Sequence, residues 1–192
     1  MTAAQKPPGA GRSSFELIDR ERFFREVPLK KSTVFLDLGC GRGEYAIPIA
    51  QAIGPEGKVY GVDAWAEGLA ELNERASSLG LTNIETLAAD VNQGIPLRDQ
   101  MVDVAFMATV LHDLLRDNTG EVVLRGAARV LKPKGKLVIV EYKKIETPSG
   151  PPVSMRLSEQ ELGEITARSG FRMDRVSEVG PYHYLFIASM PG

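Results

Sequence analysis

Three aspartates follow short apolar runs, where acidic side chains often bind the hydroxyl or amino groups of a ligand. Asp37, Asp63 and Asp90 each stand at or near the end of such a run. Because the carboxyl ends of parallel strands meet at one edge of a sheet, we expect the three carboxylates to converge on one crevice. From its position after a glycine-rich turn, Asp63 can accept hydrogen bonds from both hydroxyls of a ribose. Asp90 could meet the amino group of an adenine.

The glycine-rich turn, Gly39-Cys40-Gly41-Arg42-Gly43, separates the first apolar run from a helical pattern. Because glycine has no Cβ, such a turn brings backbone N–H groups close to a ligand. The dinucleotide fingerprint requires glycines at relative positions one, three and six, whereas Glu44 occupies the sixth position here. The pattern therefore disfavours NAD, and Asp37 suits a cationic ligand better than a pyrophosphate.

The chain has two histidines, and both are candidates for acid–base chemistry. His112 follows the fourth expected strand, and His183 opens the last one, with Tyr142 at the end of the fifth. A histidine at this edge could remove a proton from a bound acceptor. The competing interpretation is an ordinary capping or surface position for each histidine. A metal site built from His112, Asp113 and His183 is disfavoured, because the sequence lacks a ligand spacing such as His-x-x-x-His.

The elements that position these residues follow from hydrophobic periodicity. Short β-branched runs alternate with helically periodic segments, which predicts a mostly parallel sheet covered by helices. Strands are expected over 33–38, 58–63, 84–89, 102–108, 136–142, 171–179 and 182–189, the last two as a hairpin. Helices are expected over 44–53, 65–79, 120–131 and 158–168. Ser158 and Glu161 form a capping box for the last helix.

The composition of the N-terminus predicts a segment separate from the main domain. Residues 1–14 are rich in Pro, Gly, Ala and Ser and lack the apolar centre of a secretion signal, which predicts a flexible lead-in. Residues 15–192 are then expected to form a single domain, with a short amphipathic helix that ends before Pro28. The Pro- and Gly-rich segment 147–152 is typical of a loop that covers or lines a site.

Composition limits the function classes. The 192 residues include 43% apolar residues and one cysteine, which indicates one soluble domain without a disulfide framework, as expected in the cytoplasm. With 23 basic and 25 acidic side chains the net charge is −2, so nucleic acid is an unlikely partner. The lysines at 132, 134 and 136 begin the fifth strand and those at 143 and 144 follow its end, which places them at opposite edges. No apolar run approaches the roughly 20 residues of a membrane span.

Taken together, the motifs resemble those of class I S-adenosylmethionine-dependent methyltransferases. The resemblance covers about 32–141 and is strongest to the small ubiquinone- and menaquinone-type enzymes. It rests on segments 34–43, 61–63, 89–90, 102–106 and 130–137. It implies an α/β fold, a Rossmann-like three-layer sandwich around a seven-stranded sheet of order 3-2-1-4-5-7-6, with the last strand antiparallel.

The resemblance also implies S-adenosylmethionine as cofactor and S-adenosylhomocysteine as product. Its motifs assign Asp37, Gly39, Gly41 and the backbone near Arg42 and Gly43 to the methionine part, Asp63 to the ribose, Ala64 and Trp65 to one side of the adenine, Asp90 and Val91 to the adenine edge, and Ala108 to the sulfonium. No metal is implied.

The expected activity is methyl transfer to a small molecule. The Asn-Pro-Pro-Tyr signature of base and glutamine N-methyltransferases is absent after the fourth strand, where residues 108–113 resemble small-molecule enzymes instead. A general base is needed only if the acceptor must lose a proton, and His112, His183 and Tyr142 are the candidates. The acceptor atom stays open among O, N, S and C. An RNA or protein methyltransferase and a non-catalytic cofactor-binding regulator are the alternatives, and the chain is expected to be a monomer or homodimer.

Overall fold

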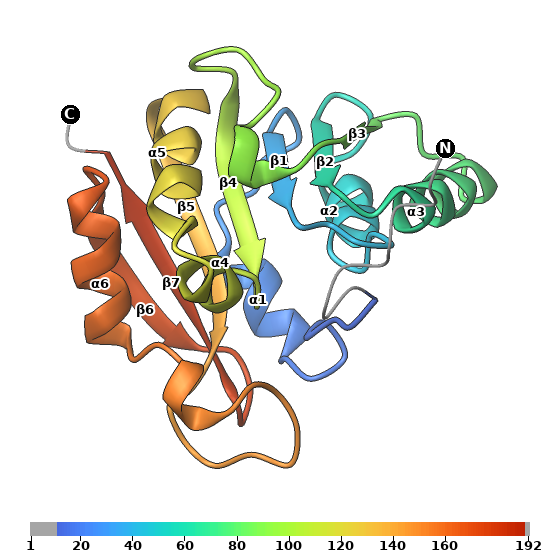
Figure 1. The fold of residues 1–192 in the computed structure, drawn as a ribbon. Coiled ribbons are helices and arrows are strands. Elements are labelled where there is room, and N and C mark those ends of the chain that lie inside the picture. The colour runs from blue at the N-terminus through green and yellow to red at the C-terminus, as the bar shows by residue number, and fades with distance from the viewer. Residues whose placement is uncertain (1–10, 191–192) are drawn as a thin grey trace, which may run out of the picture.

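A seven-stranded sheet forms the centre of the computed structural model, which describes residues 11–190 (Figure 1). The strands run in the order β3-β2-β1-β4-β5-β7-β6, and β7 is antiparallel to both of its neighbours. Their bounds are β1 (Val34–Leu38), β2 (Lys58–Asp63), β3 (Ile84–Ala88), β4 (Val102–Ala108), β5 (Leu131–Tyr142), β6 (Arg172–Glu178) and β7 (His183–Ser189). The predicted strand order and the Rossmann-like class are confirmed.

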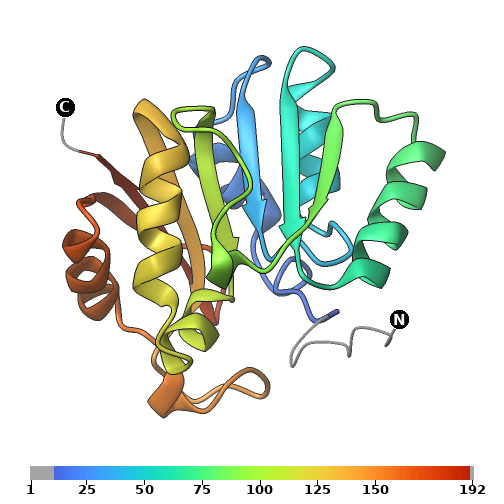
Figure 2. The same cartoon turned by 45° about the horizontal axis from the view of Figure 1, so that its top comes forward.

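Helices cover both faces of the sheet, as Figure 2 shows. One layer contains α1 (Arg20–Glu26), α2 (Ala46–Ile53) and α3 (Ala66–Ser78), and the other contains α4 (Leu111–Arg116), α5 (Gly120–Val130) and α6 (Glu159–Arg168). Consecutive strand residues point to opposite faces, so Phe35 packs in the first layer and Leu36 in the second. Two 3-10 turns, η1 (Val91–Gln93) and η2 (Val153–Met155), interrupt the loops.

Most element ends lie close to their predicted positions, and the departures have local causes. The predicted capping box is present, since the Ser158 side chain accepts from the Glu161 N–H and the Glu161 side chain accepts from the Ser158 N–H. Strand β5 begins at Leu131 rather than Lys136, because Leu131 and Lys136 pair with Val102 and Val104 and the residues between them bulge out. Helix α4 was not predicted, because six residues are too few to show a helical period.

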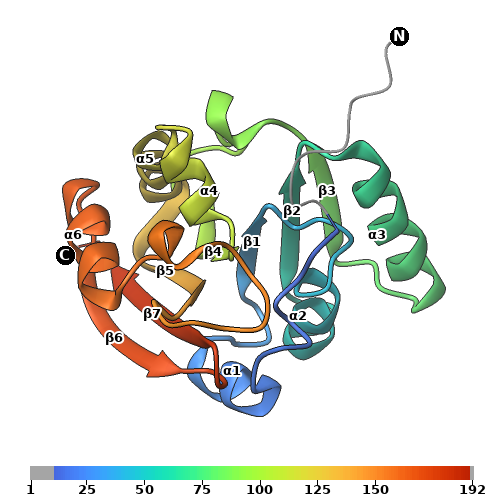
Figure 3. The same cartoon turned by 60° about the horizontal axis from the view of Figure 1, so that its bottom comes forward.

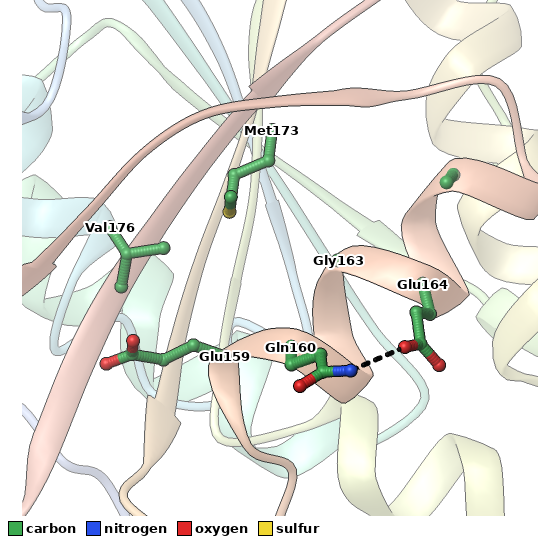
Figure 4. A pocket seen from close by; sticks show the side chains of 7 residues that line it. Glu159, Gln160, Gly163, Glu164, Met173 and Val176 are labelled. Carbon is green, nitrogen blue, oxygen red and sulfur yellow. Dashed lines mark hydrogen bonds between the residues drawn. The ribbon is translucent and has the colours of Figure 1, made fainter.

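Within residues 11–190 no helix is long and apolar enough to cross a membrane. An open groove of about 630 Å³ lies between α6 and β6, and Figure 4 shows its lining. Its rim carries Glu159 and the hydrogen-bonded pair Gln160 and Glu164. No predicted site residue lines this groove.

Candidate active site

The predicted site residues gather at the carboxyl edge of the sheet, which faces the viewer in Figure 3. Strands β1, β2, β4 and β5 end there, and β7 begins there because it is antiparallel to β5. A crevice at this edge is lined by residues 39–42 of the glycine-rich turn, Asp37, Glu44, Tyr45, Ala108 and residues 11–13. Segments from both halves of the chain therefore meet where open α/β sheets bind ligands.

Asp63 organises the glycine-rich turn. Its Oδ2 accepts a hydrogen bond of 2.8 Å from the Gly41 N–H, and its Oδ1 accepts one of 2.8 Å from the Trp65 N–H. The Gly39 N–H donates to the Val62 carbonyl oxygen at 2.8 Å. Each carboxylate oxygen of Asp63 keeps a second lone pair, so it can still accept a hydroxyl.

Asp37 is a buried carboxyl with a free oxygen. Only 3% of the residue is exposed, and its Oδ2 has no hydrogen-bond partner within residues 11–190. Burial, with smaller contributions from Asp63 and Glu44, raises the pKa of Asp37 to about 8. An unpartnered buried carboxyl is costly, and a cationic ligand at this position would supply the missing partner.

The N-terminal segment joins this crevice, which the sequence did not indicate. Gly11 and Arg12 line the crevice, and the Gly11 carbonyl oxygen accepts a 3.5 Å bond from the Arg42 guanidinium. Ser14 is buried and shares a hydrogen bond of 2.8 Å with the Tyr45 hydroxyl. Of the predicted lead-in, residues 1–10 lie outside the described residues, and the boundary of the domain stays a prediction.

The predicted adenine-side residues follow β2 and β3. Trp65 is buried against Gly68 of its own helix, Ala64 is exposed, and Val91 is half-buried. Asp90 is exposed and caps η1 by accepting a 2.9 Å bond from the Asn92 N–H. Their strands are neighbours in the sheet, so all four lie on the side of the crevice that contains Asp63. Their contact with an adenine stays a prediction.

On the other side of the crevice, His112 contacts a residue that the sequence analysis missed. Its Nδ1 lies 2.9 Å from Oε2 and 3.1 Å from Oε1 of Glu141, in β5. Glu141 has no exposed surface, and His112 is 6% exposed. An acidic residue inside the apolar run that forms β5 is the signal that could have identified Glu141.

Tyr142 and His183 continue a row of candidate acid–base side chains that begins with His112. They are register partners across β5 and β7, and their ring centroids lie 4.3 Å apart. The rings of Tyr142 and His112 are 6.4 Å apart, so the three predicted acid–base residues are close together. Burial, helped by Arg156 and Lys143, lowers the pKa of His183 to about 4, so this ring is neutral at pH 7. Neither of its buried nitrogens has a hydrogen-bond partner within residues 11–190.

Arg156 fixes the loop that covers this row, a role that no pattern in the sequence indicated. Its guanidinium lies 5.0 Å from the centroid of the Tyr142 ring. It donates to the carbonyl oxygens of Lys143, Ile145, Ser149 and Pro151 and to the hydroxyl of Thr147. The segment 143–156 is therefore tied down beside Tyr142. The predicted covering loop has a defined conformation, because one buried cation satisfies several of its backbone acceptors.

The sheet order, the glycine-rich turn and the acidic residue that ends β2 define a class I methyltransferase domain. Residues 29–172 match the family model described as a methyltransferase domain. The chain belongs to this methyltransferase-domain family, and the resemblance stated from the motifs is confirmed.

Individual relatives agree with this family. The structure of a SAM-dependent methyltransferase from Aquifex aeolicus is 37% identical, with a TM-score of 0.83 over 95% of this chain and 93% of that one. A demethylmenaquinone methyltransferase of Geobacillus kaustophilus is 32% identical over 64% of this chain. That match covers 50% of the relative, so the chain spans about half the length of the curated relatives it matches. A putative type 11 methyltransferase from Sulfolobus solfataricus, 24% identical over 92% of this chain and 94% of that one with a TM-score of 0.72, shares the fold.

Proposed function

We propose that this protein transfers a methyl group from S-adenosylmethionine to a small-molecule acceptor. The observation that carries the proposal is the buried, unpartnered oxygen of Asp37 beside a glycine-rich turn that Asp63 holds open. A carboxyl with a missing partner, next to exposed backbone and a second carboxylate, suits a ligand with an ammonium group and a ribose. S-adenosylmethionine has both.

The residues of the crevice fit this cofactor. Asp37 would bind the ammonium group, the turn from Gly39 to Gly43 would lie against the methionine part, and Asp63 would bind the ribose hydroxyls. Trp65, Ala64, Asp90 and Val91 would enclose the adenine, and Ala108 would lie beneath the sulfonium. When bound, the cofactor supplies an electrophilic methyl group at the end of β4. Burial raises the pKa of the Cys40 thiol well above its ordinary value, so Cys40 acts as a small turn residue rather than a nucleophile.

The acceptor side favours a small molecule. His112, Tyr142 and His183 lie in one row beneath a pinned loop, and the neutral His183 ring can both donate and accept a hydrogen bond. Such a site contributes mainly by orienting the acceptor and excluding water. The curated relatives suggest a reduced demethylmenaquinone analogue as the first acceptor to test.

A nucleic-acid acceptor receives no support from the surface. Four of the five lysines near the ends of β5 lie in ion pairs, Lys132 with Asp103, Lys136 with Asp174, Lys143 with Glu178 and Lys144 with Glu161. A net charge of −2 also gives no overall attraction to a phosphate backbone. A reducing cytoplasm fits the single buried thiol.

The experiment that tests this function measures binding and turnover separately. Calorimetry should detect S-adenosylhomocysteine binding, and anaerobic incubation with S-adenosylmethionine and a reduced short-chain demethylmenaquinone analogue should give a product heavier by one methylene. Absence of binding would refute the cofactor assignment. Binding without turnover on a panel of phenols, amines, thiols and quinols would favour the regulatory alternative. RNA binding that weakens steeply with salt would favour the nucleic-acid alternative.

A first prediction concerns the pH dependence of cofactor binding. In the free protein Asp37 is protonated below about pH 8, and an ammonium group favours its ionised form. Binding must therefore release a proton at neutral pH, and affinity should rise as pH approaches about 8. Calorimetry of S-adenosylhomocysteine binding in buffers of different ionisation enthalpy should show release of about one proton near pH 7.

The Asp37→Asn variant is the control. It should bind S-adenosylhomocysteine more weakly and release no proton. Because the pKa of Asp37 is raised in the folded state, the wild-type protein loses folding stability as pH rises toward about 8. At pH 8 the ligand-free Asp37→Asn variant should therefore melt no lower than wild type. A wild-type affinity that stays constant from pH 6 to pH 8 without proton release would contradict the assignment.

A further inference from the structure

Glu141 is a fully buried carboxylate in β5, one residue from its end, and the cofactor does not account for it. Besides the His112 ring, its oxygens accept from two backbone groups, the His112 N–H and the Tyr142 N–H, both at 3.3 Å. Burying a carboxylate is expensive, and removing it in favour of an apolar residue is often neutral or stabilising. A carboxylate kept here, and aimed at one imidazole, indicates a task beyond holding β5 to α4.

The contact selects one form of the His112 ring. A carboxylate can only accept hydrogen bonds, so Nδ1 must carry the proton that it donates to Glu141. In the neutral ring, Nε2 is then the basic nitrogen. The nearest acidic group to Nε2 is Asp113, whose Oδ2 lies at 3.7 Å, beyond hydrogen-bonding distance.

The charged groups around the His112 ring also make it a stronger base. Burial alone would lower the pKa of His112, and Arg116 acts in the same direction. The hydrogen bond and charge of Glu141, with a contribution from Asp113, outweigh both, so the pKa of His112 is raised. Tyr142, the other titratable group facing this ring, has a pKa raised mainly by burial and stays neutral near pH 7.

The position of α4 connects this base to the cofactor crevice. Val110, two residues before His112, lies against the glycine-rich turn, since a Cβ added to Gly39 would come within 2.8 Å of its side chain. The Thr109 N–H donates to the Val140 carbonyl oxygen at 2.8 Å, which ties the turn after β4 to β5. The start of α4 therefore contacts the glycine-rich turn, while His112, two residues later, lies beside Tyr142.

We propose that Glu141 is a positioning residue that orients His112 as the general base for an acceptor with a phenol-type hydroxyl. The proposal rests on the proposed methyl-transfer function and narrows its acceptor class. In the proton-transfer step the acceptor O–H bond breaks, its proton bonds to Nε2 of His112, and the electron pair stays on the acceptor oxygen. Glu141 stabilises the resulting imidazolium. An amine or thioether acceptor already has a nucleophilic lone pair and would need no such base.

The test is nuclear magnetic resonance of the histidine rings, which is simple because the chain has two histidines. In wild type the titration midpoint of His112 should lie above the ordinary value for histidine. Long-range ¹⁵N–¹H spectra recorded above that midpoint should show a protonated Nδ1 and a bare Nε2. In Glu141→Gln the midpoint should fall by at least about one pH unit, because the negative charge is lost. Asp113→Asn is the matched control, an acid-to-amide change beside the same ring, and should move the midpoint less.

Kinetics supply the second measurement. In Glu141→Gln, kcat with a phenol or quinol acceptor should fall about tenfold to a hundredfold, and the rising limb of its pH profile should move to lower pH. Affinity for S-adenosylhomocysteine should stay within about twofold, which separates this proposal from the cofactor assignment. A neutral wild-type His112 ring with its proton on Nε2, or an active Glu141→Gln enzyme with the wild-type kcat and pH profile, would overturn the proposed role of Glu141 while leaving methyl transfer intact. The wild-type spectrum shows which nitrogen of the neutral His112 ring carries the proton, even if the Glu141→Gln variant does not fold.

Discussion

Replacing Asp63 by alanine should weaken S-adenosylhomocysteine binding by at least about tenfold, or 1.4 kcal/mol. Two effects add. The variant loses the proposed bonds to the ribose hydroxyls, and it releases the Gly41 and Trp65 N–H groups that Asp63 now accepts from at 2.8 Å each. Hydrogen bonds to a charged group contribute about 1.5–3 kcal/mol, so either effect alone is large enough to measure.

Calorimetry checks this prediction, and two further variants locate the cause. Asp63→Asn keeps one acceptor oxygen and should fall between wild type and alanine. Asp99→Ala removes the same charge from an exposed pair with Arg129, away from the crevice, and should leave affinity unchanged. If Asp63→Ala binds as tightly as wild type while melting normally, Asp63 does not hold the ribose.

Replacing Gly43 by alanine should destabilise the fold by roughly 2–5 kcal/mol. Its φ of +82° is a backbone conformation that costs about 1–2 kcal/mol for a residue with a Cβ. The added methyl group would lie 2.2 Å from the Cδ1 of Leu72, a fully buried side chain of α3. Overpacking of this kind adds about 1–3 kcal/mol.

Gly41→Ala is the matched comparison two residues earlier in the same turn. Its φ is +52°, and an added Cβ would meet no atom within 4 Å, so the expected cost to stability is about 1 kcal/mol. Because Gly41 lines the crevice, the methyl group should instead reduce cofactor affinity. Urea unfolding and calorimetry should thus assign Gly43 to folding and Gly41 to binding. Equal losses of stability in the two variants would show that the packing against Leu72 is unimportant.

The cofactor half of the site was predictable from the sequence because its signals are local. Glycines at 39, 41 and 43 and acids at strand ends reflect the backbone beside them, and strand order follows once the motif series is recognised. The capping box at Ser158 has the same origin. Each of these features lies within a few residues of its own cause.

The acceptor half was predictable only in part, because it depends on contacts between distant residues. His112 and Glu141 are separated by 29 positions, and no spacing rule links a short helix to the end of a strand. Arg156 resembles an ordinary surface arginine in sequence, and only the folded loop shows that five of its neighbours share one guanidinium. The burial of Ser14 has the same origin, since Tyr45 lies 31 positions away.

The guanidinium of Arg156 also matters for redesigning this protein. Its partners are carbonyl oxygens and one hydroxyl of the segment it closes, so most of what shapes that segment is carried within it. We therefore expect the segment from Lys144 to Met155 to be exchangeable as a unit. Transplanting it between homologues that keep an arginine at its downstream end should redirect the choice of acceptor and leave the glycine-rich turn, with its hold on the methyl donor, undisturbed.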